Sequence, residues 1–176
     1  MQNKIAVRHL IFSTAFGHAA VIYREDPFSL TETLLPRASR KSLFQASGKD
    51  EMGKAGSHEN ARAVSESILG YFEGKQLHIP WEWMDMNRLT PLQKSVLKAV
   101  AAIPYGKMGS YKEIAENISS PRAARFVGNT VPKNPFPILI PCHRVVRSDG
   151  SIGKFGGGPE LKRKMIELEA KYAEIL

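Results

Sequence analysis

The chain has 176 residues, 43% of them hydrophobic, and a formal net charge of +8, which suits one or two small domains with a packed core. Its single cysteine excludes an internal disulfide framework and any multi-cysteine zinc site, and its five histidines show no metal-ligand spacing, so we expect no metal. No apolar run reaches membrane-spanning length and the first residues lack a signal-peptide pattern, which predicts a cytoplasmic protein with no membrane partner.

The first half of the chain predicts an α/β domain. Runs rich in strand-forming residues predict three strands at 7–14, 19–24 and 28–35. Gly17 lies between the first two runs and favours a hairpin. Residues 36–56 are poor in aliphatic side chains and predict an exposed loop, whereas the apolar period that follows predicts a helix over 57–72. A linker rich in aromatic residues comes next, so we expect domains at 1–86 and 87–176.

Helix-start signals mark the second half. Thr90 begins a capping box with a proline at the first helical position, which predicts a helix over 91–103. Ser110 begins a second capping box and predicts a short helix, and a third helix is predicted over 122–131. Two short helices across a two-residue break favour a helix-turn-helix, although any small helical domain can contain such a pair.

The positive charge lies entirely in the second half. Residues 1–86 carry 10 Lys and Arg against 10 Asp and Glu, whereas residues 87–176 carry 15 against 7. No acidic residue occurs between Glu116 and Asp149, while five cations do: Arg122, Arg125, Lys133, Arg144 and Arg147. Such a patch favours a polyanionic partner and tilts the helix-turn-helix toward DNA, although a basic half is often only a solvated face.

The third predicted helix has a face without bulky side chains. Ala123, Ala124 and Gly128 make this face, and Gly128 costs about 1 kcal/mol relative to alanine within a helix. The face could lie against a sugar-phosphate wall or pack against another helix. Arg125 is the one long side chain among these small residues.

The only cysteine stands in a stretch suited to a reactive thiol. Cys142 ends an apolar run and directly precedes His143, with Arg144 and Arg147 close by. Positive charge or a histidine near a thiol lowers its pKa. The prolines of the run predict a rigid, partly buried turn. The alternative is an inert small hydrophobic residue, which is the commoner role of a lone cysteine beside aliphatic side chains.

The chain after the cysteine predicts a turn, a glycine-rich loop and a last helix. The turn is expected at 148–151, and the loop over 153–158 carries one aromatic residue, Phe155. The helix begins at Pro159, with an apolar stripe of Leu161, Met165, Leu168 and Tyr172. Glu169 lies at the edge of that stripe, where a carboxylate is usually ion-paired and could also orient a histidine.

Several motifs together resemble one family over about residues 88–172. They are Ser110-Tyr111, Arg122-Ala123-Ala124-Arg125, Val127-Gly128, Asn134-Pro135 and Pro141-Cys142-His143-Arg144-Val145-Val146. The sequence is similar to the O6-alkylguanine-DNA alkyltransferases. The resemblance implies an N-terminal ribonuclease-H-like α/β domain with an antiparallel sheet and a helical C-terminal domain with a winged helix-turn-helix. It also implies a monomer without a cofactor.

The resemblance implies a suicide repair reaction. The alkyl group of O6-alkylguanine, and of O4-alkylthymine, would pass once and irreversibly from DNA to Cys142. His143 would act as the base through a water, and Glu169 would hold its imidazole. Asn134 would brace the turn by hydrogen bonds, and Tyr111 would donate a proton toward the departing guanine.

The resemblance also implies how double-stranded DNA is bound. The expected DNA contacts are Tyr111, Arg122, Ala124, Arg125, Gly128 and Arg144. The small-residue face would enter the minor groove, and Arg125 would fill the space of the flipped-out nucleotide. The expected substrate pocket is lined by Val131, Ile152, Phe155, Gly156 and Gly157. Family members often have a tyrosine and a serine at positions 155 and 156, so a hydroxyl contact to the base is missing here and the pocket is expected to be roomier.

Two other functions compete with this prediction. A non-enzymatic relative that binds alkylated DNA would lack the acceptor thiol, which Cys142 supplies. A conventional thiol hydrolase could use Cys142 and His143, but adjacent residues of an extended turn point apart, and a helix-turn-helix would then have no purpose.

Overall fold

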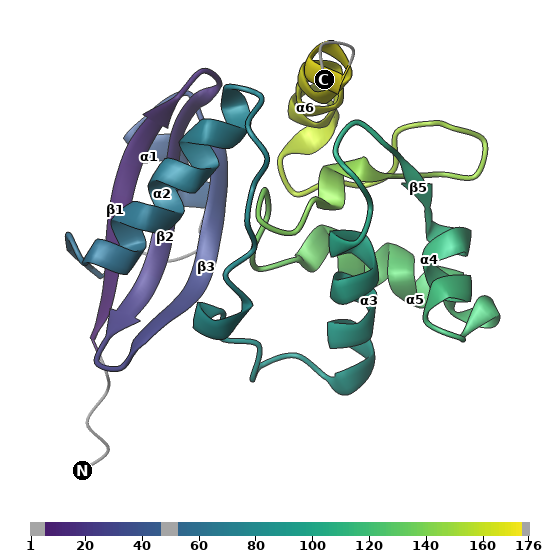
Figure 1. Ribbon diagram of the computed structural model, residues 1–176, viewed down its shortest axis with the longest axis horizontal. Coiled ribbons are helices and arrows are strands. Elements are labelled where there is room, and N and C mark those ends of the chain that lie inside the picture. The colour runs from purple at the N-terminus through teal and green to yellow at the C-terminus, as the bar shows by residue number, and fades with distance from the viewer. Residues whose placement is uncertain (1–5, 47–52, 174–176) are drawn as a thin grey trace. The chain divides into compact units, whose positions relative to one another are not determined.

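The computed structural model describes residues 6–46 and 53–173. The chain divides into two compact units, Met1–Met86 and Asn87–Leu176 (Figure 1). Among the described helices, none has the length and apolar character needed to cross a membrane.

The first unit is built on a mixed four-stranded sheet. Strands β1 (Val7–Thr14), β2 (Gly17–Glu25) and β3 (Phe28–Arg37) form an antiparallel meander, which confirms the three predicted strands. The two-residue strand β4 (Lys54–Ala55) pairs with β1 in parallel, giving the order β3-β2-β1-β4. The sheet is therefore not wholly antiparallel, because a short return of the chain adds one parallel edge strand.

Two helices cover this sheet. Figure 1 shows α2 (Glu59–Phe72) across the front of the sheet and α1 (Arg40–Ala46) behind it. The prediction of a loop over 36–56 is wrong where α1 and β4 form; residues 47–52 lie outside the described part. The seven-residue α1 buries Leu43 against Ala20 and Ile22 of β2. So short a helix, with Leu43 and Phe44 as its only large apolar side chains, leaves too little periodicity for the sequence to reveal it.

The second unit is helical. Its helices are α3 (Pro91–Ala101), α4 (Tyr111–Asn117), α5 (Ala124–Thr130) and α6 (Gly158–Ala173). Both predicted capping boxes are present, at Thr90 and Ser110. The 3-10 turn η2 (Pro121–Ala123) precedes α5, so the helix predicted over 122–131 begins as a tighter turn. A two-stranded parallel ribbon of β5 (Gly109–Ser110) and β6 (Val145–Val146) joins the start of α4 to the chain that follows the cysteine.

Candidate active site

Cys142 lies in a tight, buried turn of the second unit. The 3-10 turn η4 (Cys142–Arg144) follows a reversal in which Ile140 donates its backbone N–H to Phe136, at 2.8 Å. Ile138 adopts a φ of +76°, a conformation that β-branched residues rarely take and that costs about 1–3 kcal/mol. The side chains around it are buried, and only 3% of Cys142 is exposed. The reversal therefore fixes the cysteine in one place.

Asn134 ties this reversal together from the end of η3 (Val131–Lys133). Its Nδ2 donates to the carbonyl of Ile140 at 2.9 Å, and its Oδ1 accepts from the backbone N–H of Phe136 at 2.9 Å. The amide of Asn134 also hydrogen-bonds to the sulfur of Cys142, which favours the thiolate. One side chain thus hydrogen-bonds to both sides of the turn and to the sulfur.

The thiol of Cys142 is neutral in the resting protein. Burial raises its pKa to about 11, and the hydrogen bond from Asn134 and the charge of Lys162 offset this only in part. The hypothesis that neighbouring cations lower this pKa is therefore wrong for the resting state. The reason is geometric: the side chain of Arg144 is directed to Glu169, and Arg147 is exposed.

Glu169, buried on α6, accepts hydrogen bonds from two segments, η4 and the chain at Gly106. Its carboxylate accepts from His143 Nε2 at 2.6 Å, from Arg144 Nε at 2.9 Å and from the backbone N–H of Gly106 at 2.9 Å. Burial alone would raise the pKa of Glu169, but the hydrogen bonds and charges of His143 and Arg144 outweigh it and lower the pKa to about 2. Burial lowers the pKa of His143 in spite of this carboxylate, so its imidazole is neutral near pH 7.

Arg144 is an internal residue that pairs with Glu169. Its Nε and Nη2 donate to Glu169, its Nη1 donates to the carbonyl of Ile103 at 2.6 Å, and its guanidinium lies 5.5 Å from the centre of the Tyr105 ring. The residue is only 8% exposed. This burial argues against the DNA contact expected for Arg144, and its charge helps to keep Glu169 ionised.

Tyr111, the first residue of α4, is half-buried beside α5 and the glycine-rich loop. A Cβ placed on Gly128 would lie 3.9 Å from the tyrosine ring, and a Cβ on Gly153 would overlap the hydroxyl group. The backbone of Lys154 hydrogen-bonds to the hydroxyl, and burial raises the pKa of Tyr111. Gly153, which we did not predict as a site residue, is therefore needed to leave space for Tyr111.

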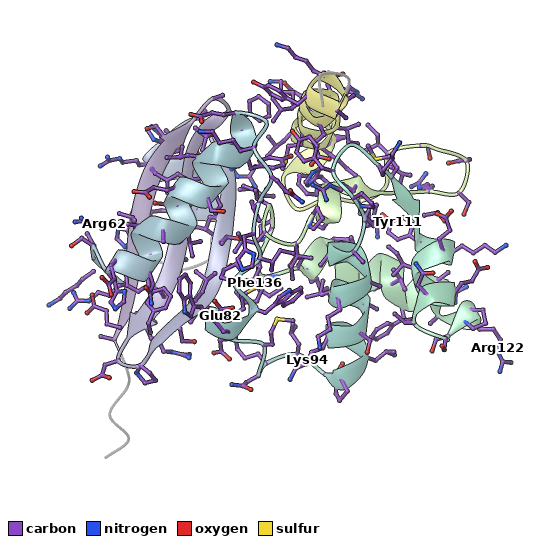
Figure 2. All side chains as sticks on the ribbon, in the orientation of Figure 1. Arg62, Glu82, Lys94, Tyr111, Arg122 and Phe136 are labelled. Atoms are coloured by element: carbon purple, nitrogen blue, oxygen red, sulfur yellow. The ribbon has the colours of Figure 1, made fainter. Side chains whose placement is uncertain are left out.

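The predicted DNA-binding residues of α5 lie on the outside of the unit. Arg122 and Arg125 are exposed, and Figure 2 shows Arg122 pointing outward from the turn before α5. Ala124 and Gly128 are partly exposed. The turn before α5 and α5 itself thus carry two exposed cations together with small, partly exposed residues.

The residues predicted to line the pocket differ in exposure. Val131 is fully buried, Ile152, Phe155 and Gly157 are partly exposed, and Gly156 is exposed. A Cβ on Gly156 would be 3.5 Å from the carbonyl oxygen of Pro132, which is an ordinary contact. Position 156 therefore has room for a small side chain that this sequence does not supply.

Lys162 is a buried residue of the site that the sequence analysis did not single out. It is fully buried on α6, where its Nζ donates to the carbonyls of Val145 and Gly153. The buried positions of α6 are Lys162, Met165 and Glu169. Of the predicted apolar stripe only Met165 is buried, and its other three residues are partly exposed. Lys162 precedes Met165 by three residues and Glu169 by seven, so helix geometry places all three on one face. The charge of a lysine instead favours an exposed position, which is why the sequence did not reveal its burial.

No group of three or more His, Cys, Asp or Glu side chains that could hold a metal ion is found in the described ranges. The site therefore consists, within those ranges, of a buried thiol, a His143–Glu169–Arg144 network, a lysine and a tyrosine.

Comparisons with known proteins agree with this arrangement. The family model for the 6-O-methylguanine DNA methyltransferase DNA-binding domain matches residues 91–171. A methylated-DNA–protein-cysteine methyltransferase of Methanosarcina barkeri is 41% identical over 111 residues, which cover 61% of this chain and 67% of the relative. One from Mycolicibacterium paratuberculosis is 38% identical over 126 residues, covering 70% and 75%.

A solved structure extends the similarity to both units. The crystal structure of Mycobacterium tuberculosis OGT in complex with DNA matches with a TM-score of 0.71 and 29% sequence identity, over 94% of each chain. The match confirms the predicted fold class, an N-terminal sheet domain followed by a helical DNA-binding domain. The chain belongs to the methylated-DNA–protein-cysteine methyltransferase family.

Proposed function

We propose that this protein repairs DNA by transferring the alkyl group of O6-alkylguanine, and of O4-alkylthymine, to Cys142. The observation that carries the proposal is the buried single cysteine beside the His143–Glu169 pair, in the same unit as the exposed Arg122 and Arg125. The named relatives support the reaction, since they are methylated-DNA–protein-cysteine methyltransferases.

The proton of the thiol is expected to pass to His143. If Nε2 carries the hydrogen shared with Glu169, the Nδ1 lone pair is the base, and a water can relay the proton. The Cys142 sulfur then attacks the alkyl carbon, a sulfur–carbon bond forms and the bond from that carbon to guanine O6 breaks. The bonding electrons leave with the guanine, and the thioether that remains has no group able to expel it.

Tyr111 is the acid that we assign to the leaving guanine. Its raised pKa keeps the hydroxyl protonated at neutral pH, so it can donate to a ring nitrogen as negative charge develops there. The proton taken by His143 restores Tyr111 through solvent. The net result exchanges the thiol hydrogen for the alkyl group.

The exposed face of α5 is the DNA surface that we propose. The target oxygen faces the partner base in a duplex, so the nucleotide has to leave the stack, which costs a few kcal/mol. Ala124 and Gly128 allow close approach in the minor groove, and the planar guanidinium of Arg125 can occupy the vacated space. Arg122 is placed to contact a phosphate, so affinity should fall as salt is added.

Intact-protein mass measurement tests the function. The protein is incubated with a duplex oligonucleotide that contains one O6-methylguanine. We expect one methyl group per chain, mapped to Cys142, and no further turnover. The Cys142→Ala variant should bind the same duplex without gaining mass. Binding without transfer by the natural chain would instead identify a non-enzymatic lesion-binding protein.

A further inference from the structure

Lys162 is a buried cation whose charge has no carboxylate partner. Its Nζ donates to two backbone carbonyls, those of Val145 and Gly153, and no Asp or Glu within residues 6–46 and 53–173 forms an ion pair with it. Carbonyl dipoles satisfy the hydrogens of an ammonium group but do not cancel its charge. An uncompensated buried charge is costly, and proteins that keep one usually use it.

The remaining charges of the site cancel among themselves. Glu169 is ionised and accepts from Arg144, which is cationic, and from His143, which is neutral. The network of these three side chains is therefore neutral, and the thiol of Cys142 is neutral as well. One excess positive charge is left, and it belongs to Lys162.

The two backbone contacts of Lys162 place this charge at the reacting turn. Val145 follows Cys142 by three residues, and Gly153 is the residue that Tyr111 packs against. Of the titratable groups, Cys142 and His143 of η4 interact electrostatically with Lys162. A negative charge on the sulfur is the one event in the proposed reaction that would compensate the ammonium.

We propose that Lys162 is the counter-charge that stabilises the Cys142 thiolate while the alkyl group is transferred. The inference rests on the proposed function for its biological meaning, but the effect on the thiolate can be measured without DNA. Lys162 acts through its charge and takes no part in bond making. When the thiolate becomes a thioether, the compensation is lost again.

Alkylation by iodoacetamide measures the effect directly, because Cys142 is the only cysteine and a sulfur–carbon bond forms as iodide leaves. In Lys162→Gln, which keeps hydrogen-bond donors and removes the charge, we expect the rate near pH 7 to fall about tenfold or more, as for a thiol pKa raised by about one unit. Burial lowers the pKa of Lys162 to about 8, so the natural protein loses this charge above that pH. The ratio of the two rates should therefore shrink toward one as the pH rises past 8.

Lys164→Gln is the matched control, since Lys164 is an exposed lysine of the same helix that pairs with Glu160. It should leave the rate unchanged at every pH. A ratio for Lys162→Gln that stays constant with pH would indicate a merely structural role and overturn the proposal. Failure of methyl transfer from DNA with the iodoacetamide profile intact would instead overturn the proposed function alone.

A second measurement does not depend on how well Lys162→Gln folds. The iodoacetamide rate of the natural protein alone is followed as the pH rises through 8. Below that pH the rate should rise about tenfold per pH unit, and above it the rise should flatten, because Lys162 then loses the charge that favours the thiolate. A rise that keeps the same slope above pH 8 would show that the two groups do not interact and would refute the inference.

Discussion

Replacing Arg144 by methionine separates an internal role from a DNA-binding role. Methionine fills much of the same volume but leaves the carboxylate of Glu169 buried without its cation. Removing one partner of a buried ion pair destabilises a protein by about 3–5 kcal/mol. DNA binding should be affected little, because the guanidinium does not face solvent.

The pKa of Glu169 gives an independent measure of the stability that the partners of its carboxylate contribute. The difference between about 2 in the folded protein and about 4.3 in an unfolded chain corresponds to about 3 kcal/mol, shared by all partners of the carboxylate. Because the folded pKa is depressed, this stability is present above pH 4.3 or so and is lost as the pH falls toward 2. In Arg144→Met, the loss of unfolding free energy should be smaller near pH 6 than near pH 8. The positive charge of Arg144 lowers the pKa of His143, so without it the imidazole can bind a proton near pH 6 and pair with Glu169.

Urea denaturation and salt-dependent DNA binding form the assay. For Arg144→Met we expect the free energy of unfolding to fall by about 3 kcal/mol at pH 8. The slope of log affinity for DNA against log salt concentration should stay unchanged. Arg122→Met is the control with the opposite expectation: stability within about 0.5 kcal/mol of the natural protein and a slope reduced by about one. A reduced salt slope with full stability in Arg144→Met would refute the internal role.

Substitutions at three further positions test other parts of the second unit. Arg125→Lys and Arg125→Ala should both slow transfer from duplex DNA by more than about tenfold, or about 1.4 kcal/mol, and leave transfer from free O6-benzylguanine unchanged; equal losses on both substrates would contradict the flipping role. Gly106→Ala should lower thermal stability by more than about 1 kcal/mol, because Gly106 has a φ of +71° and a Cβ there would lie 2.6 Å from the Cβ of Ala173. Thr90→Ala should cost about 0.5–2 kcal/mol in urea denaturation, since Thr90 caps the backbone N–H of Gln93; unchanged stability would mean that the capping box does not hold α3.

Much of the fold could be predicted because its signals are local. Runs rich in strand-forming residues identified the three long strands, and the capping boxes at Thr90 and Ser110 identified the starts of α3 and α4. The elements that were missed depend on tertiary contacts. Helix α1 is held by the burial of Leu43, and β4 by pairing with β1, and neither leaves a periodic signal in so few residues.

The site shows where neighbours in sequence mislead. Cys142 and Arg144 are two residues apart, which suggested that the arginine would lower the pKa of the thiol, but in the turn its guanidinium pairs with Glu169. The charge that does act on the thiol comes from residue 162, twenty positions later on another element. A linear window contains no information on which side chains of a turn point the same way.

The spacing within α6 accounts for the charge pattern of the site. Positions seven residues apart in a helix lie on the same face, about two turns and about 10 Å from each other. Lys162 and Glu169 therefore both project from α6 toward the core. Between them, Met165 supplies the apolar contact of a normal buried face. One helix thus delivers an anion to the base and a cation to the nucleophile, and it separates them by more than the reach of a direct ion pair. If they were four residues apart they could neutralise each other, and the thiolate would have no counter-charge. The chemistry of Cys142 therefore depends on the register of a helix that begins sixteen residues after it.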